Sequence, residues 1–451
     1  MSQELSKEKT ELFESMPVST AVLKLSVPTV FGCLVMILYS LADTYFVGKL
    51  DDPVQTSAVT LVAPIILLFN AVNNLFGVGS GSMMSRALGK KEYDMVRRTS
   101  AFSFYAALFS GILFSLVAIA FRKPLLSLLG SGSEDYAATI AYMKWTVFFG
   151  AAPAILNVVM GNMVRSEGAA MHATLGTVSG CLLNILLDPL FILPRFLGLG
   201  AAGAGLATFL SNSVACLYFL IYVIIKRGKT FVSIDLGIAL PTAEIVKEVF
   251  GVGIPAAIQN ILNVTGMTIL NNTLSGYGLE AVSAMGIAHK MSLIPMYISM
   301  GIGQGIMPLI GYNYAAKNKK RMREALLFTV KISAVLVLAL AAVFIGWSEG
   351  IMRIFMKNET VVTIGTAFIR GLSFATPFFA VDFLAVGIFQ ACGLGKYSLY
   401  FAVARKVILE IPAILILDRL YPMYGVAYAQ LTAELVLSVA AVILLRKLMR
   451  D

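Results

Sequence analysis

Charged residues are scarce in this chain. Asp, Glu, Lys and Arg together make up 13% of its 451 residues, whereas a soluble globular domain has about 25%. Hydrophobic residues reach 58% and are spread along the whole length, which indicates one membrane-embedded unit rather than two or three soluble domains. The first 16 residues are charged and polar, so we expect no signal peptide.

Cysteine and histidine are also scarce. The four cysteines lie in apolar segments at unrelated spacings, which favours small packing residues over a metal motif or a disulfide framework. His172 and His289 have no metal-ligand partner at a useful spacing, and there is no Walker A sequence. We therefore expect no enzyme activity, no cofactor and no metal bound by these cysteines and histidines.

The net charge of +10 raises the question of a nucleic-acid partner. The basic residues, however, form short clusters between apolar runs, which is typical of cytoplasmic loops and not of a nucleic-acid-binding face. Most of them fall on one side when both termini are placed in the cytoplasm. The pattern predicts a multi-pass protein of the plasma (cytoplasmic) membrane, in contact with lipid, with both termini cytoplasmic and no nucleic-acid partner.

Apolar segments long enough to span a bilayer, about 20 residues each, occur twelve times. The sequence therefore predicts an all-α polytopic membrane protein with twelve transmembrane helices. We place them near residues 20–48, 54–85, 95–121, 134–164, 171–194, 200–225, 246–274, 280–312, 322–346, 361–392, 396–418 and 423–448.

The two halves of the chain repeat each other. Pro28 pairs with Pro255, Gly168 with Gly393, and Gly203 with Gly425, in a nearly constant register. Because each repeat holds six helices, an even number, the repeats are parallel and related by an axis along the membrane normal. We predict two pseudo-symmetric six-helix lobes, with the N-lobe at 1–227, a linker at 228–245 and the C-lobe at 246–451. Such lobes enclose a cleft and rock about it.

Carboxylates inside the membrane segments need an explanation, since each costs about 2.5–3.5 kcal/mol to insert. Asp43 lies in the first helix. Asn184 and Asp188 share a face of the fifth helix, and Thr208 lies in the sixth. Oxygen ligands of this kind suit Na⁺, and two close carboxylates can instead hold a proton. The alternative is that Asp43 caps a helix end and Asp188 pairs only with backbone.

Polar residues elsewhere form a possible secondary site, although it lacks a faithful copy of Asp43. Glu410 either joins such a site or pairs with Arg405 or Lys406, and we favour pairing. The candidate members of the secondary site are Asn212, Gln259, Asn263, Asp382 and Glu434.

Several blocks resemble the multidrug and toxic compound extrusion (MATE) transporters, bacterial branch, over nearly the whole chain. The Arg165 and Asn184 blocks are the more specific ones. The blocks are ADTYFVG at 42–48, GKK at 89–91, RSEG at 165–168, NILLDPLFI at 184–192, GAGLAT at 203–208 and QACG at 390–393.

The resemblance implies twelve helices in two lobes and export of lipophilic organic cations coupled to inward Na⁺ or H⁺. A self-contained two-lobe cleft needs no partner subunit, so we expect a monomer. Carried over residue by residue, the cation site would be Asp43, Asn184, Asp188 and Thr208. Two rivals within the same superfamily stay open: a lipid-linked oligosaccharide flippase and an exporter of an unidentified metabolite. An intramembrane enzyme and a non-transporting receptor are less favoured.

Overall fold

The computed structural model describes residues 10–50, 52–129 and 134–450, and contains no strand in these ranges. Nine single helices are long and apolar enough to cross a membrane. They are α2 (Val18–Gly48), α3 (Pro53–Gly89), α4 (Tyr93–Ala120), α8 (Ala170–Ile192), α9 (Ala201–Ile225), α10 (Ala243–Ser275), α11 (Leu279–Ala315), α12 (Lys319–Gly346) and α18 (Ala429–Arg450).

Two further spans are bent. The first consists of α6 (Tyr136–Met143), the π-helical segment η1 (Lys144–Phe149) and α7 (Ala151–Ser166), and it bends by 45°. Gly150 and Pro153 follow the π-turn, and a Cβ at Gly150 would collide with the carbonyl of Trp145. The second span joins α14 (Glu359–Ser373) to α15 (Thr376–Ala391) with a bend of 47°, where Pro377 begins the new helix.

The remaining span is the eleventh along the chain, made of α16 (Gly395–Val403), η3 (Ala404–Glu410) and α17 (Ile411–Leu420). Its π-helical middle carries Arg405, Lys406 and Glu410, so length and apolar composition alone do not select it. The connections contain α5 (Arg122–Leu128), η2 (Leu236–Ile238), α13 (Ser348–Phe355) and η4 (Gly425–Tyr428). The described helices thus confirm the predicted twelve-helix topology, within a few residues at each end.

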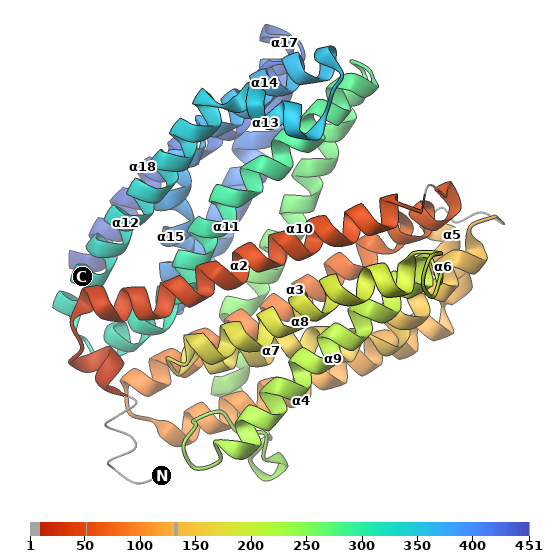
Figure 1. Cartoon of the computed structure of the whole chain (residues 1–451). Helices are drawn as coiled ribbons and strands as arrows, with labels where there is room; N and C mark the ends of the chain where they lie inside the picture. The colour runs from red at the N-terminus through yellow and green to blue at the C-terminus, as the bar shows by residue number, and fades with distance from the viewer. Residues whose placement is uncertain (1–9, 51, 130–133, 451) are drawn as a thin grey trace.

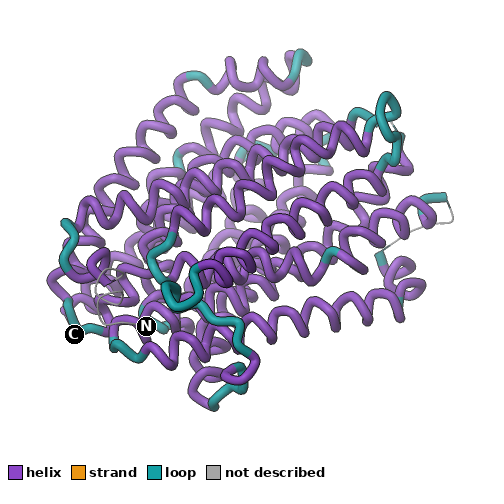
Figure 2. Tube along the Cα trace, turned by 60° about the horizontal axis from the view of Figure 1, so that its bottom comes forward, coloured by secondary structure: helices purple, strands orange, loops and turns teal. Residues whose placement is uncertain are grey.

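The helices form two bodies that diverge from a common end. Figure 1 shows α13, α14 and α17 at one tip and α5 and α6 at the other, while both chain termini lie near the opposite, shared end. Figure 2 shows the helical bundle from a second side, with helices making up nearly all of the trace. One hydrophobic core joins both bodies towards the shared end, and a second core belongs to the α13–α14 tip alone.

The predicted duplication is visible in the backbone. Lys91 and Lys317, which occupy equivalent loops, both have positive φ angles, 63° and 58°. Gly168 and Gly393, a second equivalent pair, also have positive φ angles, 89° and 77°. The absence of a Cβ in glycine removes the strain of this conformation. The bent spans are also equivalent, since each is the fourth helix of its half.

Packing repeats as well. A Cβ at Gly203 would collide with the carbonyl oxygen of Phe191, and a Cβ at Gly425 would collide with that of Leu417. Each glycine therefore lets the start of a sixth helix approach the end of a fifth helix. These matched contacts confirm two pseudo-symmetric six-helix lobes, α2–α9 and α10–α18.

The segment between the lobes is docked on the N-lobe. Ser233 N–H donates to Ser100 Oγ at 2.8 Å, Tyr105 donates to the Ile234 carbonyl at 2.9 Å, and Phe231 N–H donates to buried Glu167 at 2.7 Å. Only the second half of the connection, through η2, is left to bridge the lobes. The limits 1–227, 228–245 and 246–451 stay a prediction.

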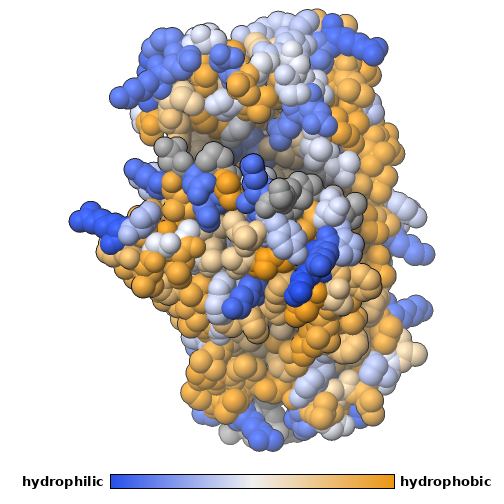
Figure 3. All heavy atoms as spheres, turned by 90° about the vertical axis from the view of Figure 1, so that its right-hand side faces the viewer, coloured by the Kyte–Doolittle hydropathy of each residue, from blue (hydrophilic) through white to orange (hydrophobic). Residues whose placement is uncertain are grey.

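The outer surface is apolar. Large side chains such as Phe109, Leu186 and Val335 are 66%, 64% and 68% exposed, which a water-soluble surface tolerates poorly when they form a continuous belt. Figure 3 shows apolar residues covering the flanks and polar residues concentrated at the ends and around a recess between the two bodies. The chain is a multi-pass membrane protein.

Candidate functional site

Asp43, Asp188 and Thr208 meet inside the N-lobe, on α2, α8 and α9. Asp188 is fully buried, Asn184 is 1% exposed, and Asp43 is half-buried. The two carboxylates are close enough to interact electrostatically. Asn184 contacts the Thr208 hydroxyl at 3.4 Å. The structure thus brings together the four residues of the predicted coupling site.

The Asn184 amide links the carboxylate to α9. With its nitrogen turned towards Asp188, that nitrogen donates to Asp188 Oδ2 at 2.8 Å, and its oxygen accepts from the Thr208 backbone N–H at 3.1 Å. Pro189 follows Asp188 directly and lies inside α8. Because proline cannot donate to the preceding turn, it frees the carbonyl oxygen of Ile185, one turn earlier in the helix.

Two tyrosines that the sequence analysis did not select also belong to this cluster. Tyr39 on α2 is hydrogen-bonded to Thr208, and Tyr142 on α6 lies within electrostatic range of both carboxylates. Tyr39 precedes Asp43 by one helical turn, so helical periodicity was a usable signal for it. Tyr142 comes from a span distant in sequence and had no such signal.

Asp43 and Asp188 have no counter-charge among the residues that the structure describes. Across residues 10–50, 52–129 and 134–450, no basic side chain forms an ion pair with Asp43 or Asp188. Buried charges are normally paired, because desolvation penalises an isolated one. The arrangement therefore suits two carboxylates that exchange a bound cation or proton.

The C-lobe acids lie in a different setting. Arg405 on η3 forms an ion pair with Asp382 on α15, and its Nε lies 3.4 Å from Glu434 on α18. The three side chains are 4%, 0% and 1% exposed. The guanidinium also lies over the Phe383 ring, 4.7 Å from its centroid. The guanidinium group of Arg405 thus lies between the Asp382 and Glu434 carboxylates.

Glu410 pairs with Lys406 at 2.7 Å, which agrees with the predicted pairing, whereas Arg405 takes the two acids above. The five residues of the possible secondary site do not come together. Asn212 accepts from Asn157 at 3.2 Å inside the N-lobe, Asp382 and Glu434 hold Arg405, and Gln259 and Asn263 line the space between the lobes. The physical reason is that helix neighbours, unlike helix faces, are not encoded locally.

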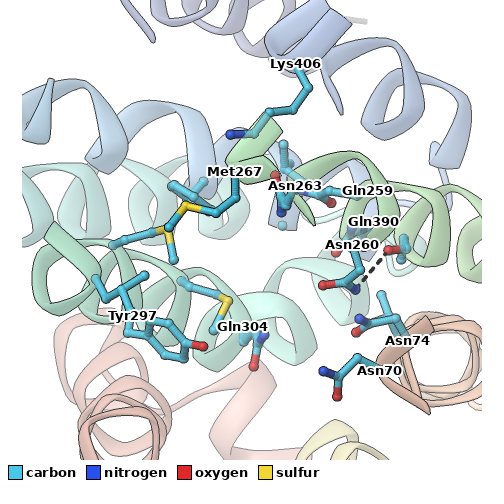
Figure 4. Close-up of a pocket in the computed structure, with 18 of the residues that line it drawn as sticks. Asn70, Asn74, Gln259, Asn260, Asn263, Met267, Tyr297, Gln304, Gln390 and Lys406 are labelled. Atoms are coloured by element: carbon cyan, nitrogen blue, oxygen red, sulfur yellow. Dashed lines mark hydrogen bonds between the residues drawn. The ribbon is translucent and has the colours of Figure 1, made fainter. Parts of the chain in front are cut away.

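A cavity of about 600 Å³ lies between the lobes. Helices α3, α7, α10, α11 and α15 contribute most of its wall. Figure 4 shows carboxamides from α3, α10 and α11 facing one another across it, together with Met267 and Tyr297. The carboxamide side chains in the lining are Asn70, Asn74, Asn162, Gln259, Asn260, Asn263, Asn271, Gln304, Gln390 and Gln430.

The lobes close beneath this cavity, towards the end that holds the termini. Helix α3 packs along α10, and α2 along α11. Arg86 on α3 forms an ion pair with Glu248 on α10 at 2.7 Å. Ser82 on α3 donates to the carbonyl oxygen of Gln390 on α15. These contacts close the cavity on the side of α3, α10 and residues 10–16, and Figure 3 shows a recess between the two bodies on the face turned to the viewer.

The N-terminal segment strengthens this closure. Phe13 stacks on Tyr312 of α11, with ring centroids 4.9 Å apart. Arg321 on α12 donates to the carbonyls of Leu12, Phe13 and Met16 at 3.2, 2.5 and 2.6 Å. Leu12 and Phe13 also lie against Gly168 of the N-lobe. Residues 10–16 thus contact both lobes at their shared end.

We compared the chain with known protein families and with curated proteins. The MatE family model matches residues 28–190 and 255–416, one match in each lobe. The chain is 33% identical to the multidrug export protein MepA of Staphylococcus aureus (strain MRSA252) over 447 residues, covering 98% of this chain and 97% of the relative. The corresponding protein of Staphylococcus saprophyticus is 32% identical over the same length and coverage.

Solved structures of transporters share the fold of this chain. A multidrug resistance MATE transporter of the MOP superfamily, described as outward-facing, aligns with a TM-score of 0.91 at 25% identity over 98% of this chain and 99% of that one. A MOP superfamily transporter from Pyrococcus furiosus, described as having a binding pocket of reversed polarity, shares the fold with a TM-score of 0.89 at 24% identity, and 98% of each chain is covered. The family match, the full-length relatives and the two-lobe fold together show that the chain belongs to the MATE family of transporters.

Proposed function

We propose that this chain is a cation-coupled antiporter that exports lipophilic organic cations by alternating access between its two lobes. The observation that carries the proposal is the pair of membrane-embedded carboxylates, Asp43 and Asp188, which have no basic partner in the described ranges. The relatives named as multidrug export proteins support a small-molecule efflux role.

The N-lobe cluster fits either coupling ion. Carboxylate, amide and hydroxyl oxygens are the ligands that a hard cation such as Na⁺ takes in proteins, and Asp43, Asp188, Asn184 and Thr208 supply all three kinds. Two neighbouring carboxylates away from water also hold a proton readily, because the second negative charge is opposed by the first. We propose that uptake of one such cation from outside changes the charge of the cluster by one unit.

Helix α2 connects this change to the lobe interface. It carries Asp43 and also packs along α11 of the C-lobe. There a Cβ at Gly301 would crowd Val30, and one at Gly305 would crowd Ser26. A shift of α2 upon neutralisation of Asp43 is therefore transmitted to the seam between the lobes, and densely packed seams tend to be bistable.

The cleft suits a bulky amphiphile. Met267, Met296, Met300 and Met307 give an adaptable and polarisable wall, and the Tyr297 ring offers a face that attracts cations. We place the termini in the cytoplasm, so the cleft faces outward in this structure and would release its cargo there. Each charge moving inward across 100 mV yields about 2.3 kcal/mol to drive the cycle.

The test uses everted vesicles and a fluorescent organic-cation dye. Wild type should take up dye when an imposed proton gradient, or an imposed Na⁺ gradient, is present, and Asp43→Asn should abolish this uptake without loss of folded protein. Asp94→Asn, an exposed carboxylate paired with Arg98, serves as the control and should transport normally. Gradient-driven uptake that persists in Asp43→Asn would refute the coupling site. No uptake with either gradient from folded wild type would favour the flippase alternative.

A further inference from the structure

The charges that line the cleft are unbalanced. Its acidic and basic side chains are Arg165, Lys406 and Glu410. Lys406 and Glu410 neutralise each other at 2.7 Å. His289 also lines the cleft. Among the described residues, Arg165 is the one charged group of the cleft without an ion-pair partner, and no unpaired carboxylate faces it.

Arg165 is positioned but not satisfied. It lies in the last turn of α7, where its Nη1 donates to Asn162 Oδ1 at 3.0 Å. Its Nε is shielded from solvent and finds no acceptor in the part of the chain that the structure describes. A guanidinium offers five donors in a planar fork that matches a carboxylate bidentately. The side chain is therefore oriented by Asn162 and left with free donors beside the cavity.

Attraction by charge alone does not explain binding of a cation in this cleft. Apart from Glu410, which Lys406 neutralises, the described lining offers positive groups the Tyr297 ring, methionine sulfur and carboxamide oxygens, all of them uncharged. An anionic group, by contrast, meets a full positive charge in a site partly shielded from water, where charge-assisted hydrogen bonds are about twice as strong as neutral ones.

We propose that Arg165 binds the carboxylate of those substrates that carry one, so that the cleft holds a zwitterionic amphiphile more tightly than the matched cation without an acidic group. This inference rests on the proposed function, because it takes the cleft as the transport path. The amine end then lies towards Tyr297 and the methionines, while the acidic end is held near the closed floor between the lobes.

The experiment measures binding and transport of two matched probes, a fluorescent fluoroquinolone zwitterion and its methyl ester, which lacks the negative charge. Affinity is titrated by fluorescence with the purified full chain in nanodiscs, for wild type, Arg165→Gln and Arg165→Lys. We expect Arg165→Gln to raise the Kd of the zwitterion about tenfold and to leave the Kd of the ester within about twofold. Arg165→Lys should restore part of the affinity, since it keeps the charge but loses the fork.

The ester also reports whether the variant is folded. Equal loss of affinity for both probes would show that Arg165 acts only on the structure and would overturn the proposal. Displacement of the zwitterion by short-chain phosphatidylglycerol in wild type but not in Arg165→Gln would assign the site to a lipid phosphate instead. That result would also overturn the proposal. Failure of the proposed function looks different: neither probe would be transported by wild type, while the Arg165-dependent difference in Kd would remain.

Discussion

Buried acidic side chains have different partners in the two lobes. Asp43 and Asp188 in the N-lobe pair with no basic side chain in the described ranges, whereas Asp382 and Glu434 in the C-lobe share Arg405. A buried carboxylate that already has a guanidinium gains little from Na⁺ or a proton, because its charge is compensated. The N-lobe acids are therefore the better candidates for coupling, and the C-lobe acids for structure.

The first prediction follows from this contrast. Arg405→Gln leaves Asp382 and Glu434 buried together without a counter-charge, so we expect it to destabilise the protein by about 3–5 kcal/mol. Thermal melting in detergent should show a clearly lower Tm. The double variant with Asp382→Asn should recover much of the loss, because one of the two like charges is removed.

Arg98→Gln is the matched control for that prediction. Arg98 pairs with Asp94 at 2.7 Å, but the two side chains are 42% and 73% exposed, and exposed pairs of this kind contribute about 0–1 kcal/mol. A Tm for Arg405→Gln no lower than that of the control would mean that the C-lobe triad is not a structural ion pair.

At the scale of elements, the closest contact between the lobes depends on glycines. A Cβ at Gly253 of α10 would collide with the carbonyl oxygen of Leu75, and a Cβ at Gly79 of α3 would collide with that of Val249. Backbone groups cannot move aside as flexible side chains can, so α3 and α10 would have to separate. Small residues at helix seams allow such approach generally in membrane proteins.

The second prediction uses two glycines of the same helix. Gly253→Ala should widen the seam between α3 and α10 and reduce gradient-driven dye uptake at least about tenfold, while Gly251→Ala should retain it, since nothing lies within 4 Å of a Cβ at Gly251. Both changes raise helix propensity equally, so propensity cancels in the comparison. Similar activity of the two variants would show that the close approach is not needed for transport.

For the whole molecule, the structure shows one of the two openings that the proposed alternating access requires. The lobes are apart at the tips formed by α5, α6, α13 and α17 (Figure 1) and joined at the other end by Arg86–Glu248 and by residues 10–16. The Tyr312 hydroxyl donates to Glu14 at 2.6 Å and thereby holds the pKa of that carboxyl below its usual value, with Lys91 assisting. Opening to the other side must break these contacts.

The third prediction is that loosening this closure shifts the conformational equilibrium. Arg321→Gln removes three hydrogen bonds to the carbonyls of Leu12, Phe13 and Met16. A change of about 1.4 kcal/mol moves a two-state equilibrium tenfold. We expect labelling of Asn263→Cys in the cleft by an impermeant maleimide, added outside intact cells, to slow at least about twofold.

The four native cysteines must first be replaced by serine in that experiment. Arg353→Gln is its control, because Arg353 lies in α13 at the far tip and pairs only with exposed Glu349 and Glu359 in the described chain. Faster labelling, or an equal change in the control, would contradict the role given to residues 10–16.

Local sequence patterns determined much of this protein. Apolar length gives most of the spans, because a bilayer excludes unpaired backbone groups and permits few other spanning structures. The matched pairs Gly168–Gly393 and Gly203–Gly425 predict the duplication, and the cost of a carboxylate in the membrane selects Asp43 and Asp188. Each of these signals lies within one helix or one repeat, so each can be read without knowing which helices are neighbours.

Only the tertiary structure decided which side chains neutralise one another. Arg405 is close in sequence to Glu410, yet it pairs with Asp382 and Glu434 from two other helices, and Tyr142 joins the N-lobe acids from a bent span. Inside the membrane nearly every helix is apolar, so hydrophobicity does not specify partners. Close packing and a few polar contacts do, and these arise between segments that the chain brings together only when it folds.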